Sequence, residues 1–277
     1  MPNPMIHPTA VISETAILGS DVQVGPYCII GAGARIGAGC RLEPHAIIRE
    51  GCEVGEGCLI DSFVVIGGEA QMRVPDPTAA GGQVVVGART IFREGVTVHR
   101  PARAGGSTVI GNDCFFMANT HIAHDCQVSD WVTMANGAML GGHVHVAPYA
   151  FVGGGAGVHQ FVRLGENAMV AGNAAISYDV PPFSVAADRN DIVGLNLVGL
   201  RRRGFSSEVM ADLKRCFRAV YHGSGNVREE AAKAVADTAL GVTAQGQTFL
   251  GFFAGGHRGF GHKRRGRRST DVDGADS

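Results

Sequence analysis

The feature that most constrains the fold of this chain is a large apolar residue at every sixth position along most of the sequence. Since only about a quarter of residues in proteins are large and apolar, unbroken runs with this spacing do not arise by chance. A fixed short period indicates a solenoid, in which each repeat stacks on the next. The ladder positions are Ile6, Ile12, Leu18, Val24, Ile30, Ile36, Leu42, Ile48, Val54, Ile60 and Ile66, then Val86, Phe92 and Val98, and then Ile110, Phe116, Ile122, Val128, Met134, Leu140, Val146, Val152, Val158, Leu164, Val170 and Ile176.

A second slot lies four residues after the ladder positions and holds small or β-branched residues. In a strand, positions two apart share a face, so this slot and the next ladder residue both point into the core. The sequence has no Cys-x-x-Cys pair, and we interpret the cysteines in this slot as compact core residues rather than metal ligands or disulfide partners. Six of the seven cysteines occupy the slot: Cys28, Cys40, Cys52, Cys58, Cys114 and Cys126.

Turn residues separate the ladder positions, as in Val24-Gly25-Pro26, Ile36-Gly37-Ala38 and Val54-Gly55-Glu56. Glycine gives the backbone the freedom that a tight corner needs, and the chain has 41 glycines but only 6% aromatic residues. Each hexapeptide is therefore predicted to form one short strand and one turn, and three of them close a triangular coil. Stacked coils bury a continuous core behind parallel sheets, which predicts an all-β parallel β-helix.

Two breaks interrupt the ladder, at residues 67–85 and 99–109. Excursions of this kind are usually loops on the surface of a solenoid, and long ordered loops often carry function. The repeat ends near Pro181-Pro182, so we assign residues 1–190 to the β-helix.

The C-terminal part of the chain has a different pattern. Residues 191–260 are predicted to form a small α-helical domain, because a helix start at Phe205-Ser-Ser-Glu208 precedes apolar residues that share one face. Asn226 with Glu229 resembles a capping box for a second helix. Residues 261–277 are basic and are predicted to form a flexible tail.

Charge and hydropathy argue against nucleic acid and membrane as partners. The net charge is −1 and 45% of the residues are hydrophobic, which predicts a folded chain without a nucleic-acid surface. The N-terminus lacks the charged and apolar regions of a signal peptide, and no stretch approaches the roughly 18 apolar residues of a membrane span. A cytoplasmic location is therefore the expectation.

Four histidines, His121, His124, His143 and His159, lie outside the inward-facing slots. His121 and His159 flank ladder residues and point outward, whereas His124 and His143 fall at turns. Any one of them is as well explained by a solvated surface position, but outward histidines on neighbouring coils can converge on one cleft. Because imidazole titrates near neutral pH, such a cluster suits acid–base chemistry. We therefore expect a site where these histidines gather.

The sequence around the histidines is specific and includes Thr97-Val-His-Arg100, Asn119-Thr-His-Ile-Ala-His-Asp-Cys126, Gly141-Gly-His143, Val158-His-Gln-Phe161 and Asn196-Leu-Val-Gly-Leu-Arg-Arg-Arg-Gly-Phe205. In this order, over nearly the whole chain, these segments resemble the family of UDP-N-acetylglucosamine acyltransferases that start lipid A biosynthesis. The resemblance implies a left-handed β-helix and a homotrimer with clefts between its subunits. It also implies transfer of a 3-hydroxyacyl group from acyl carrier protein to the 3-hydroxyl of UDP-N-acetylglucosamine. The donor is carried on the phosphopantetheine of the carrier protein, so no other cofactor and no metal is expected.

The same resemblance assigns roles around the reacting atoms. It implies that His124 is the general base, which takes the proton of the sugar alcohol as the alcohol attacks the thioester. Asp125 beside it would orient the ring and stabilise the imidazolium. The backbone N–H of Gly142 would bind the developing oxyanion, and a glycine there permits close approach of the substrate.

Further residues are implied to bind the substrates. The cleft would be lined by His121, His143, His159 and Gln160, which hold sugar, phosphate or acyl hydroxyl. The nucleotide diphosphate or the acidic carrier protein would contact Asn196, Arg202 and Arg203, and the fork of donors on arginine suits phosphate. Gly172 would lie at the end of the acyl groove, where a glycine leaves room for a chain of roughly fourteen carbons.

Two segments depart from the family pattern. The family loop reads Gln-Asp-Leu-Lys, whereas here Gln71 is followed by Met72 and Arg73, so the acid that contacts the sugar and the lysine are both absent. The glutamate expected two residues after Asn196 is Val198. These changes leave the proposed base and oxyanion donor intact, but they leave a related acceptor, such as a 3-amino sugar, open.

Three other functions stay open on the sequence. A γ-class carbonic anhydrase uses the same solenoid with three zinc-binding histidines, for which His121, His124 and His143 are candidates. The segment 196–205 and the helical domain argue against it, since such a hydrase needs neither. An acetyl-CoA-dependent acetyltransferase would also use a histidine base, but it does not explain the sequence around His124 and His159. A purely structural solenoid needs no outward histidine cluster.

Overall fold

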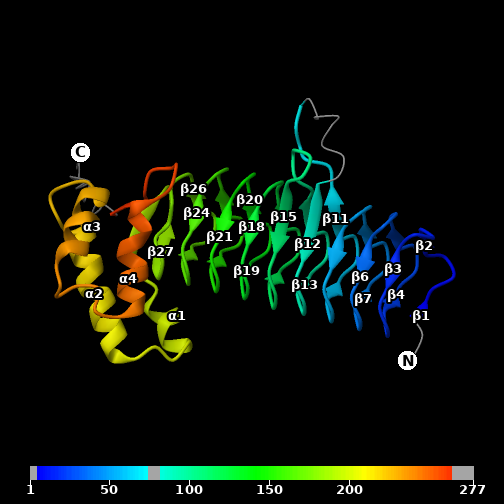
Figure 1. Ribbon diagram of the computed structural model, residues 1–277, viewed down its shortest axis with the longest axis horizontal. Coiled ribbons are helices and arrows are strands. Elements are labelled where there is room, and N and C mark those ends of the chain that lie inside the picture. Colours follow the sequence, from blue (N-terminus) through cyan, green and yellow to red (C-terminus); the bar gives the residue numbers. More distant parts are fainter. Residues whose placement is uncertain (1–4, 74–81, 264–277) are drawn as a thin grey trace, which may run out of the picture.

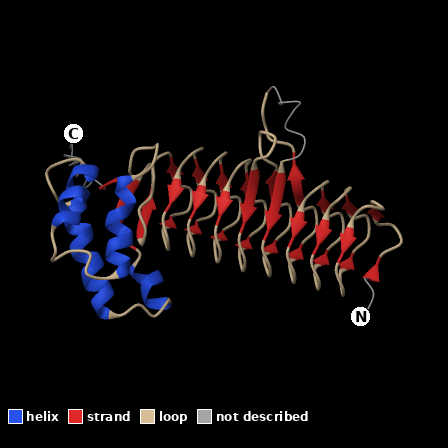
Figure 2. Cartoon of the chain, in the orientation of Figure 1, coloured by secondary structure: helices blue, strands red, loops and turns tan. Residues whose placement is uncertain are grey.

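The computed structural model describes residues 5–73 and 82–263. Short strands follow one another with a turn after each, and successive coils stack into a long prism (Figure 1). In the described chain, four α-helices gather at one end of the prism, and the N-terminal coils form the other end (Figure 2). The prism is the predicted parallel β-helix.

Each coil adds one strand to each of three sheets, because corresponding strands of neighbouring coils pair in parallel and in register, as Met5 pairs with Gln23 and Ile6 with Val24. We name each sheet by its first strand. Within the described residues, the β1 sheet consists of β1 (Met5–Ile6), β4 (Gln23–Val24), β7 (Arg41–Leu42), β10 (Leu59–Ile60), β13 (Ile91–Phe92), β16 (Phe115–Phe116), β19 (Thr133–Met134), β22 (Phe151–Val152), β25 (Met169–Val170), β27 (Ser184–Ala187), β28 (Asp191–Leu195) and β29 (His262–Lys263).

The other two sheets form the remaining sides of the prism. The described β2 sheet consists of β2 (Val11–Ile12), β5 (Ile29–Ile30), β8 (Ile47–Ile48), β11 (Val65–Gly68), β14 (Thr97–His99), β17 (His121–Ile122), β20 (Met139–Leu140), β23 (Gly157–Val158) and β26 (Ala175–Ile176). The described β3 sheet consists of β3 (Ile17–Leu18), β6 (Arg35–Ile36), β9 (Glu53–Val54), β12 (Gln83–Val86), β15 (Ser107–Ile110), β18 (Gln127–Val128), β21 (His145–Val146) and β24 (Arg163–Leu164).

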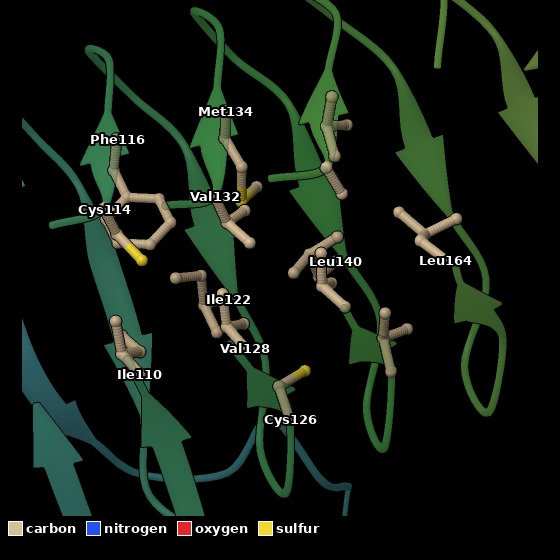
Figure 3. Close-up of a cluster of buried hydrophobic side chains, with 14 of the residues drawn as sticks. Ile110, Cys114, Phe116, Ile122, Cys126, Val128, Val132, Met134, Leu140 and Leu164 are labelled. Atoms are coloured by element: carbon tan, nitrogen blue, oxygen red, sulfur yellow. The ribbon is translucent and has the colours of Figure 1, made fainter. Parts of the chain in front are cut away.

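The ladder residues form the core, as predicted. From Val24 to Ile176 all of them are buried, whereas Ile6 is 46% exposed because no described coil covers it on the N-terminal side. All seven cysteines are buried and free, and Figure 3 shows Cys114 and Cys126 among the ladder side chains. Burying a large apolar side chain contributes about 1.5–3 kcal/mol, so the stacked ladder is the main source of stability in this part of the chain.

The two breaks in the ladder correspond to segments that connect consecutive strands of the prism. The first lies between β11 and β12 and includes residues 74–81, which are outside the described part of the chain; the second lies between β14 and β15. Strand residues extend into both predicted breaks, since β12 begins at Gln83 and β15 at Ser107. A side chain at Gly82 would collide with Pro101, so the ends of the two segments touch.

The helices begin where the polar residues of the sequence cap them. After α1 (Leu197–Arg202), the predicted helix is α2 (Ser207–Tyr221), and the Ser206 hydroxyl accepts the Val209 N–H at its start. The second predicted helix is α3 (Val227–Ala236), and the Asn226 side chain accepts two backbone N–H groups of its first turn. The bundle is completed by α4 (Ala244–Gly251) and the 3₁₀ turn Phe252–Ala254.

An arginine of the β-helix fixes the helices in place. The Arg163 guanidinium lies 2.7 Å from the buried carboxylate of Asp179 and donates to the backbone carbonyls of Phe252 and Gly255. Its guanidinium also lies 4.2 Å from the centre of the Phe252 ring. These contacts join the β3 sheet to the end of α4.

The prediction that the flexible tail begins at residue 261 is wrong for its first residues. The Gly261 N–H donates to the Asp179 carbonyl, and His262 and Lys263 form β29, which pairs in parallel with β28. The ring of Phe260, 9% exposed, packs 4.9 Å from that of Phe253 and anchors this end of the chain. Residues 264–277, the rest of the predicted tail, are outside the described part of the chain.

Candidate active site

A histidine and an aspartate form a hydrogen-bonded pair at one corner of the prism. The Nδ1 atom of His124 lies 2.8 Å from Oδ2 of Asp125. The Asp125 carboxylate also accepts the Ala102 N–H from the segment between β14 and β15, and the Asp125 N–H donates to the Thr108 hydroxyl. Because an ionised carboxylate only accepts hydrogen bonds, it selects the tautomer with the proton on Nδ1. The Nε2 atom of His124 is then the proton acceptor.

The backbone of Gly142 passes directly beside this ring. A β-carbon built on Gly142 would lie 2.6 Å from Nε2 and 2.5 Å from Cε1 of His124. No side chain fits there, so glycine is required by the neighbouring imidazole. The Gly142 N–H makes no hydrogen bond to any residue that the structure describes, which leaves it available to a bound group.

His143 packs against the pair from the next coil. Its ring meets that of His124 edge to face, with the ring centres 5.2 Å apart, and its Nε2 lies 3.7 Å from the Asp125 carboxylate. The ring also stacks on Phe161, with the ring centres 4.5 Å apart. Burial lowers the pKa of His143, and the Asp125 carboxylate opposes this shift. Both His143 and Phe161 have left-handed φ angles, a costly conformation for aromatic residues that the packed corner maintains.

His121 presents a neutral ring to the same site. Its Nδ1 lies 2.8 Å from the Thr97 hydroxyl oxygen, and its ring meets that of His99 edge to face, with the ring centres 4.8 Å apart. Burial lowers the pKa of His121, and it lowers the pKa of His99 to about 4. Both imidazoles are therefore uncharged at neutral pH.

His121 and His124 line a cavity over the β2 sheet, to which His159 also contributes. Gln71 lines the end near His121 from the segment after β11, and towards the other end the cavity crosses β20, β23 and β26, where the lining is mainly apolar apart from His159, Ser177 and Arg189. Of the outward-facing residues on these strands, Met139 is large, whereas Gly157 and Ala175 are small. The lining residues are Gln71, His121, Ala123, His124, Met139, Leu140, Gly141, Gly142, Gly157, Val158, His159, Ala175, Ile176, Ser177 and Arg189.

Comparison with known proteins places this geometry in a family. The family model for domain 2 of UDP-N-acetylglucosamine O-acyltransferase matches residues 179–261, and the bacterial transferase hexapeptide model matches residues 33–68 and 107–142. The acyl-(acyl-carrier-protein)–UDP-N-acetylglucosamine O-acyltransferase of Janthinobacterium sp. (strain Marseille) is 47% identical over 235 residues, which cover 83% of this chain and 88% of that protein. The chain belongs to the UDP-N-acetylglucosamine O-acyltransferase family.

Other members of the family agree in sequence and in structure. The enzyme of the same name from Herminiimonas arsenicoxydans is 43% identical over 84% of this chain and 89% of that protein. The UDP-N-acetylglucosamine acyltransferase of Francisella novicida superposes with a TM-score of 0.86 at 31% identity and covers 95% of both chains. That of Campylobacter jejuni gives 0.85 at 34% identity, covering 94% of this chain and all of the other. These structures confirm the predicted left-handed β-helix with a small helical C-terminal part.

A residue that the sequence analysis missed holds the family's Val-His-Gln-Phe segment in place. Arg258 donates from Nε to the Gln160 carbonyl, and its Nη2 lies 2.9 Å from Nδ1 of His159. His159 lines the cavity, whereas the Gln160 side chain is not part of its lining. Arg258 lies outside the hexapeptide repeat, so no register argument could place it beside these residues.

The Asn196-Leu-Val-Gly-Leu-Arg201 segment of this chain lies elsewhere, on a groove over the β1 sheet. Asn196 caps α1 through the Gly199 N–H, and Arg203 pairs with Glu166 at 3.0 Å and lies 3.5 Å from the centre of the Tyr149 ring. The groove is lined by Trp131, Thr133, Tyr149, Ala150, Phe151, Asn167, Met169, Asn196, Val198, Gly199, Arg202 and Arg203. A single chain therefore does not bring these residues to the histidine cavity.

Gly172 lies at a corner of the prism, and it lines neither the histidine cavity nor the β1-sheet groove. A β-carbon built on it would lie 3.3 Å from the Gly154 carbonyl oxygen. At the apolar end of the histidine cavity, the residues that line the β2 sheet are instead Gly157 and Ala175, followed by Arg189. The sequence analysis named none of these three.

Three possible metal ligands also meet at the histidine corner. Within the described chain, the ligand atoms of His124, Asp125 and His143 all lie within 4.8 Å of one another. This group differs from the three histidines expected for a hydrase, since His121 is not part of it. The Asp125 carboxylate already accepts a hydrogen bond from the His124 ring, so the same contacts serve a metal-free acid–base pair equally well.

No helix in the described part of the chain is both long and apolar enough to cross a membrane.

Proposed function

We propose that this chain transfers a 3-hydroxyacyl group from acyl carrier protein to the 3-hydroxyl of UDP-N-acetylglucosamine, the first step of lipid A biosynthesis. The observation that carries the proposal is the arrangement of His124, Asp125 and Gly142. It places a proton acceptor, a carboxylate that orients it and a free backbone N–H at one point of an open cavity. The chain's relatives bear the name of this acyl transfer.

His124 acts as general base in the proposed reaction. Its Nε2 takes the proton from the sugar 3-hydroxyl while the alcohol oxygen forms a bond to the thioester carbonyl carbon. Asp125, bonded to Nδ1, stabilises the imidazolium that results. Collapse of the tetrahedral intermediate breaks the carbon–sulfur bond, and the imidazolium returns its proton to the departing phosphopantetheine thiolate. The ester and the free thiol leave, and the histidine is neutral again.

Gly142 supplies the oxyanion donor. A preorganised backbone N–H aimed at the developing charge is typically among the largest contributions to acyl transfer. The Gly142 N–H is not used by any described residue, and the Cα of the same residue lies beside the ring that takes the proton. In the proposed reaction the donor and the base act on the same reacting carbon.

The cavity separates the two substrates by polarity. We assign the end with Gln71 and His121 to the sugar and phosphate and the end with Gly157 and Ala175 to the hydrocarbon chain, with His159 holding a polar group of the substrates between them. The neutral imidazole of His121 suits the first task, because it offers one donor and one acceptor to hydroxyls. We also assign His143, whose ring packs edge to face on that of His124, to the binding of the substrates. In the proposed reaction the donor brings its own phosphopantetheine, so no further cofactor and no metal takes part. The cytoplasm, where acyl carrier protein acts, is the expected location.

A homotrimer completes the proposed site. The histidine cavity lies over the β2 sheet and the groove with Asn196, Arg202 and Arg203 lies over the β1 sheet. A neighbouring copy can bring the second groove to the first, where the arginines and Gln160 would bind the diphosphate or the acidic carrier protein. Gly172 would then limit the acyl chain from the neighbouring subunit.

The direct test offers purified protein 3-hydroxyacyl carrier protein together with UDP-N-acetylglucosamine or its 3-amino analogue. Consumption of thioester with formation of the O-acylated sugar nucleotide supports the proposal. Acylation of the amino analogue alone would mean that a 3-amino sugar is the acceptor, and we would attribute this preference to the departures at Met72 and Val198. Failure with both acceptors, together with stoichiometric zinc and carbon dioxide hydration, would support the hydrase that the His124, Asp125 and His143 group permits.

A further inference from the structure

The buried thiol of Cys126 contacts the carbonyl of the peptide group whose N–H is the proposed oxyanion donor. The Cys126 side chain is fully buried and lies 3.2 Å from the backbone oxygen of Gly141. Figure 3 shows its sulfur in the core beside Val128 and Ile122. Burial raises the pKa of Cys126 to about 12, so at neutral pH the thiol keeps its proton and donates it to this carbonyl.

That carbonyl and the Gly142 N–H belong to one peptide group. Because the peptide is planar and trans, its C=O and N–H point in opposite directions. The carbonyl of Gly141 points to the core thiol, so the N–H of Gly142 points away from the core, and the Cα of Gly142 lies beside the His124 ring. A thiol at one edge of the peptide therefore sets the direction of the donor at the opposite edge.

No other described group performs this task. At the corner one turn earlier, the Ala135 carbonyl accepts the Ala138 N–H at 3.1 Å, a bond that closes the turn. The corresponding bond, from Val144 to the Gly141 carbonyl, is not formed, and no backbone N–H of the described chain bonds to this carbonyl. Loss of the thiol would leave the carbonyl buried without its partner, which favours rotation of the peptide.

We propose that Cys126 is a positioning residue for acyl transfer: its thiol fixes and polarises the Gly141–Gly142 peptide, and so aims the Gly142 N–H at the oxyanion. The inference rests on the proposed function, because it needs Gly142 to be the oxyanion donor. Hydrogen bonds in series strengthen one another, so the thiol also makes the N–H a better donor.

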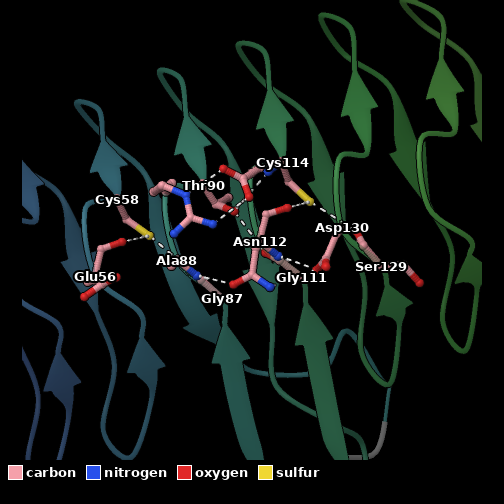
Figure 4. Close-up of polar contacts among 12 residues, drawn as sticks. Glu56, Cys58, Gly87, Ala88, Thr90, Gly111, Asn112, Cys114, Ser129 and Asp130 are labelled. Atoms are coloured by element: carbon pink, nitrogen blue, oxygen red, sulfur yellow. Dashed lines mark hydrogen bonds and ion pairs between the residues drawn. The ribbon is translucent and has the colours of Figure 1, made fainter. Parts of the chain in front are cut away.

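The chain contains the same bond at corners without chemistry, which shows what it does for the fold alone. Cys58 donates to the Gly87 carbonyl at 3.2 Å, and Cys114 donates to the Ser129 carbonyl at 3.2 Å (Figure 4). In the same slot between them, the Thr90 hydroxyl donates to the Gly111 carbonyl at 3.0 Å. A threonine thus replaces the thiol donor with the same geometry.

Valine fills this slot elsewhere without any donor, at Val132 and Val144, and both are fully buried. The fold therefore accepts a valine there. Threonine and valine have nearly the same shape and differ in the hydroxyl, so they form a matched pair for Cys126.

The test compares Cys126→Thr with Cys126→Val in steady-state acyl transfer, with Cys114→Thr and Cys114→Val as the remote control pair. We expect Cys126→Thr to keep kcat within about twofold and Cys126→Val to lower it about three- to tenfold, at unchanged KM for both substrates. This loss is a fraction of the roughly 100- to 1000-fold that removal of an oxyanion donor costs. The Cys114 pair should show equal kcat values.

Two outcomes would overturn the inference: equal kcat for Cys126→Thr and Cys126→Val, or an equal loss in Cys114→Val. The second would mean that a valine in this slot acts through the general packing of the prism. Thermal unfolding of all four variants separates a change in stability from a change in turnover. If the unmodified protein acylates no sugar nucleotide, the proposed function fails, and this is seen before any variant is compared.

Discussion

The Nδ1 atom of His124 and the Oδ2 atom of Asp125 lie 2.8 Å apart, although the two residues are neighbours in sequence and usually would face opposite ways. The left-handed φ of Asp125, 60°, turns its side chain back toward the ring that precedes it. The corner of the β-helix thus makes an acid–base pair from two consecutive residues, and an Asp tolerates this conformation better than most residues.

Asp125→Asn should lower kcat on the order of 100-fold, because an amide neither stabilises the imidazolium nor selects the tautomer with a free Nε2. Asparagine accepts the left-handed φ, so the corner should keep its shape. Steady-state kinetics at saturating substrates measure the effect. The matched control is Asp113→Asn, which changes an aspartate with a left-handed φ of 55° at a remote corner and should leave kcat unchanged. Equal kcat in the two variants would remove Asp125 from the mechanism.

Gly142→Ala should abolish most of the activity, with kcat lower by about 100-fold or more, since the new β-carbon meets the His124 ring and displaces both base and oxyanion donor. Far-ultraviolet circular dichroism should stay that of the parent protein, because the neighbouring core is unchanged. Gly251→Ala is the control, as a β-carbon there has no atom of the described chain within 4 Å. A fully active Gly142→Ala protein would contradict the assigned geometry.

Stability should fall at acid pH through the buried imidazoles. Burial lowers the pKa of His121 and His143 and brings that of His99 to about 4, whereas an unfolded histidine titrates near 6.5. The unfolded chain then binds more protons, so stability is complete above about pH 6.5 and is lost as the pH falls toward 4. Midpoints of thermal unfolding between pH 7.5 and 4.5 test this. His99→Phe keeps an aromatic ring but cannot titrate, and it should flatten the decline; an unchanged decline would exclude His99 as a cause.

The apolar end of the histidine cavity should set the length of the acyl chain. Ala175→Leu places a larger side chain on the groove and should shift the preference toward shorter 3-hydroxyacyl donors. Competition between carrier-protein donors of different length gives the ratio of kcat/KM values. Ala236→Leu, on the exposed face of α3, is the control and should not change the ratio. An unaltered preference in Ala175→Leu would mean that the acyl chain lies elsewhere. Gly172→Met would then test whether Gly172 limits the acyl chain from the neighbouring subunit.

The sequence predicted most of the fold because stacked coils of short strands bury a large apolar residue at every sixth position. Ladder residues such as Ile48 and Phe116 and the slot cysteines lie where the period places them. The same register brings Gly142 beside His124, since the two residues occupy one corner on neighbouring coils. The repeat pattern therefore predicted the scaffold and the gathering of outward histidines, whereas the roles of His124, Asp125 and Gly142 came from the resemblance to the family.

Other parts of the site depend on segments outside the repeat. Arg258 reaches His159 from beyond the helices, and Gln71 reaches the cavity from a break in the ladder, so periodicity could not place either of them. Arg189 lies after the last predicted ladder residue, forms a parallel bridge with Ala175 and lines the same cavity. The role of Cys126 was missed because its slot explains it fully as a core residue, and only the hydrogen bond to Gly141 reveals more.

The central claim is that His124 accepts the proton of the acceptor alcohol, and single-turnover transfer from 3-hydroxyacyl carrier protein to UDP-N-acetylglucosamine tests it most directly. The unmodified protein should form one O-acylated sugar nucleotide for each thioester consumed, and His124→Ala should lower the rate by about 100- to 10,000-fold while the oligomeric state stays the same. A His124→Ala protein that transfers the acyl group at the unmodified rate would contradict the account.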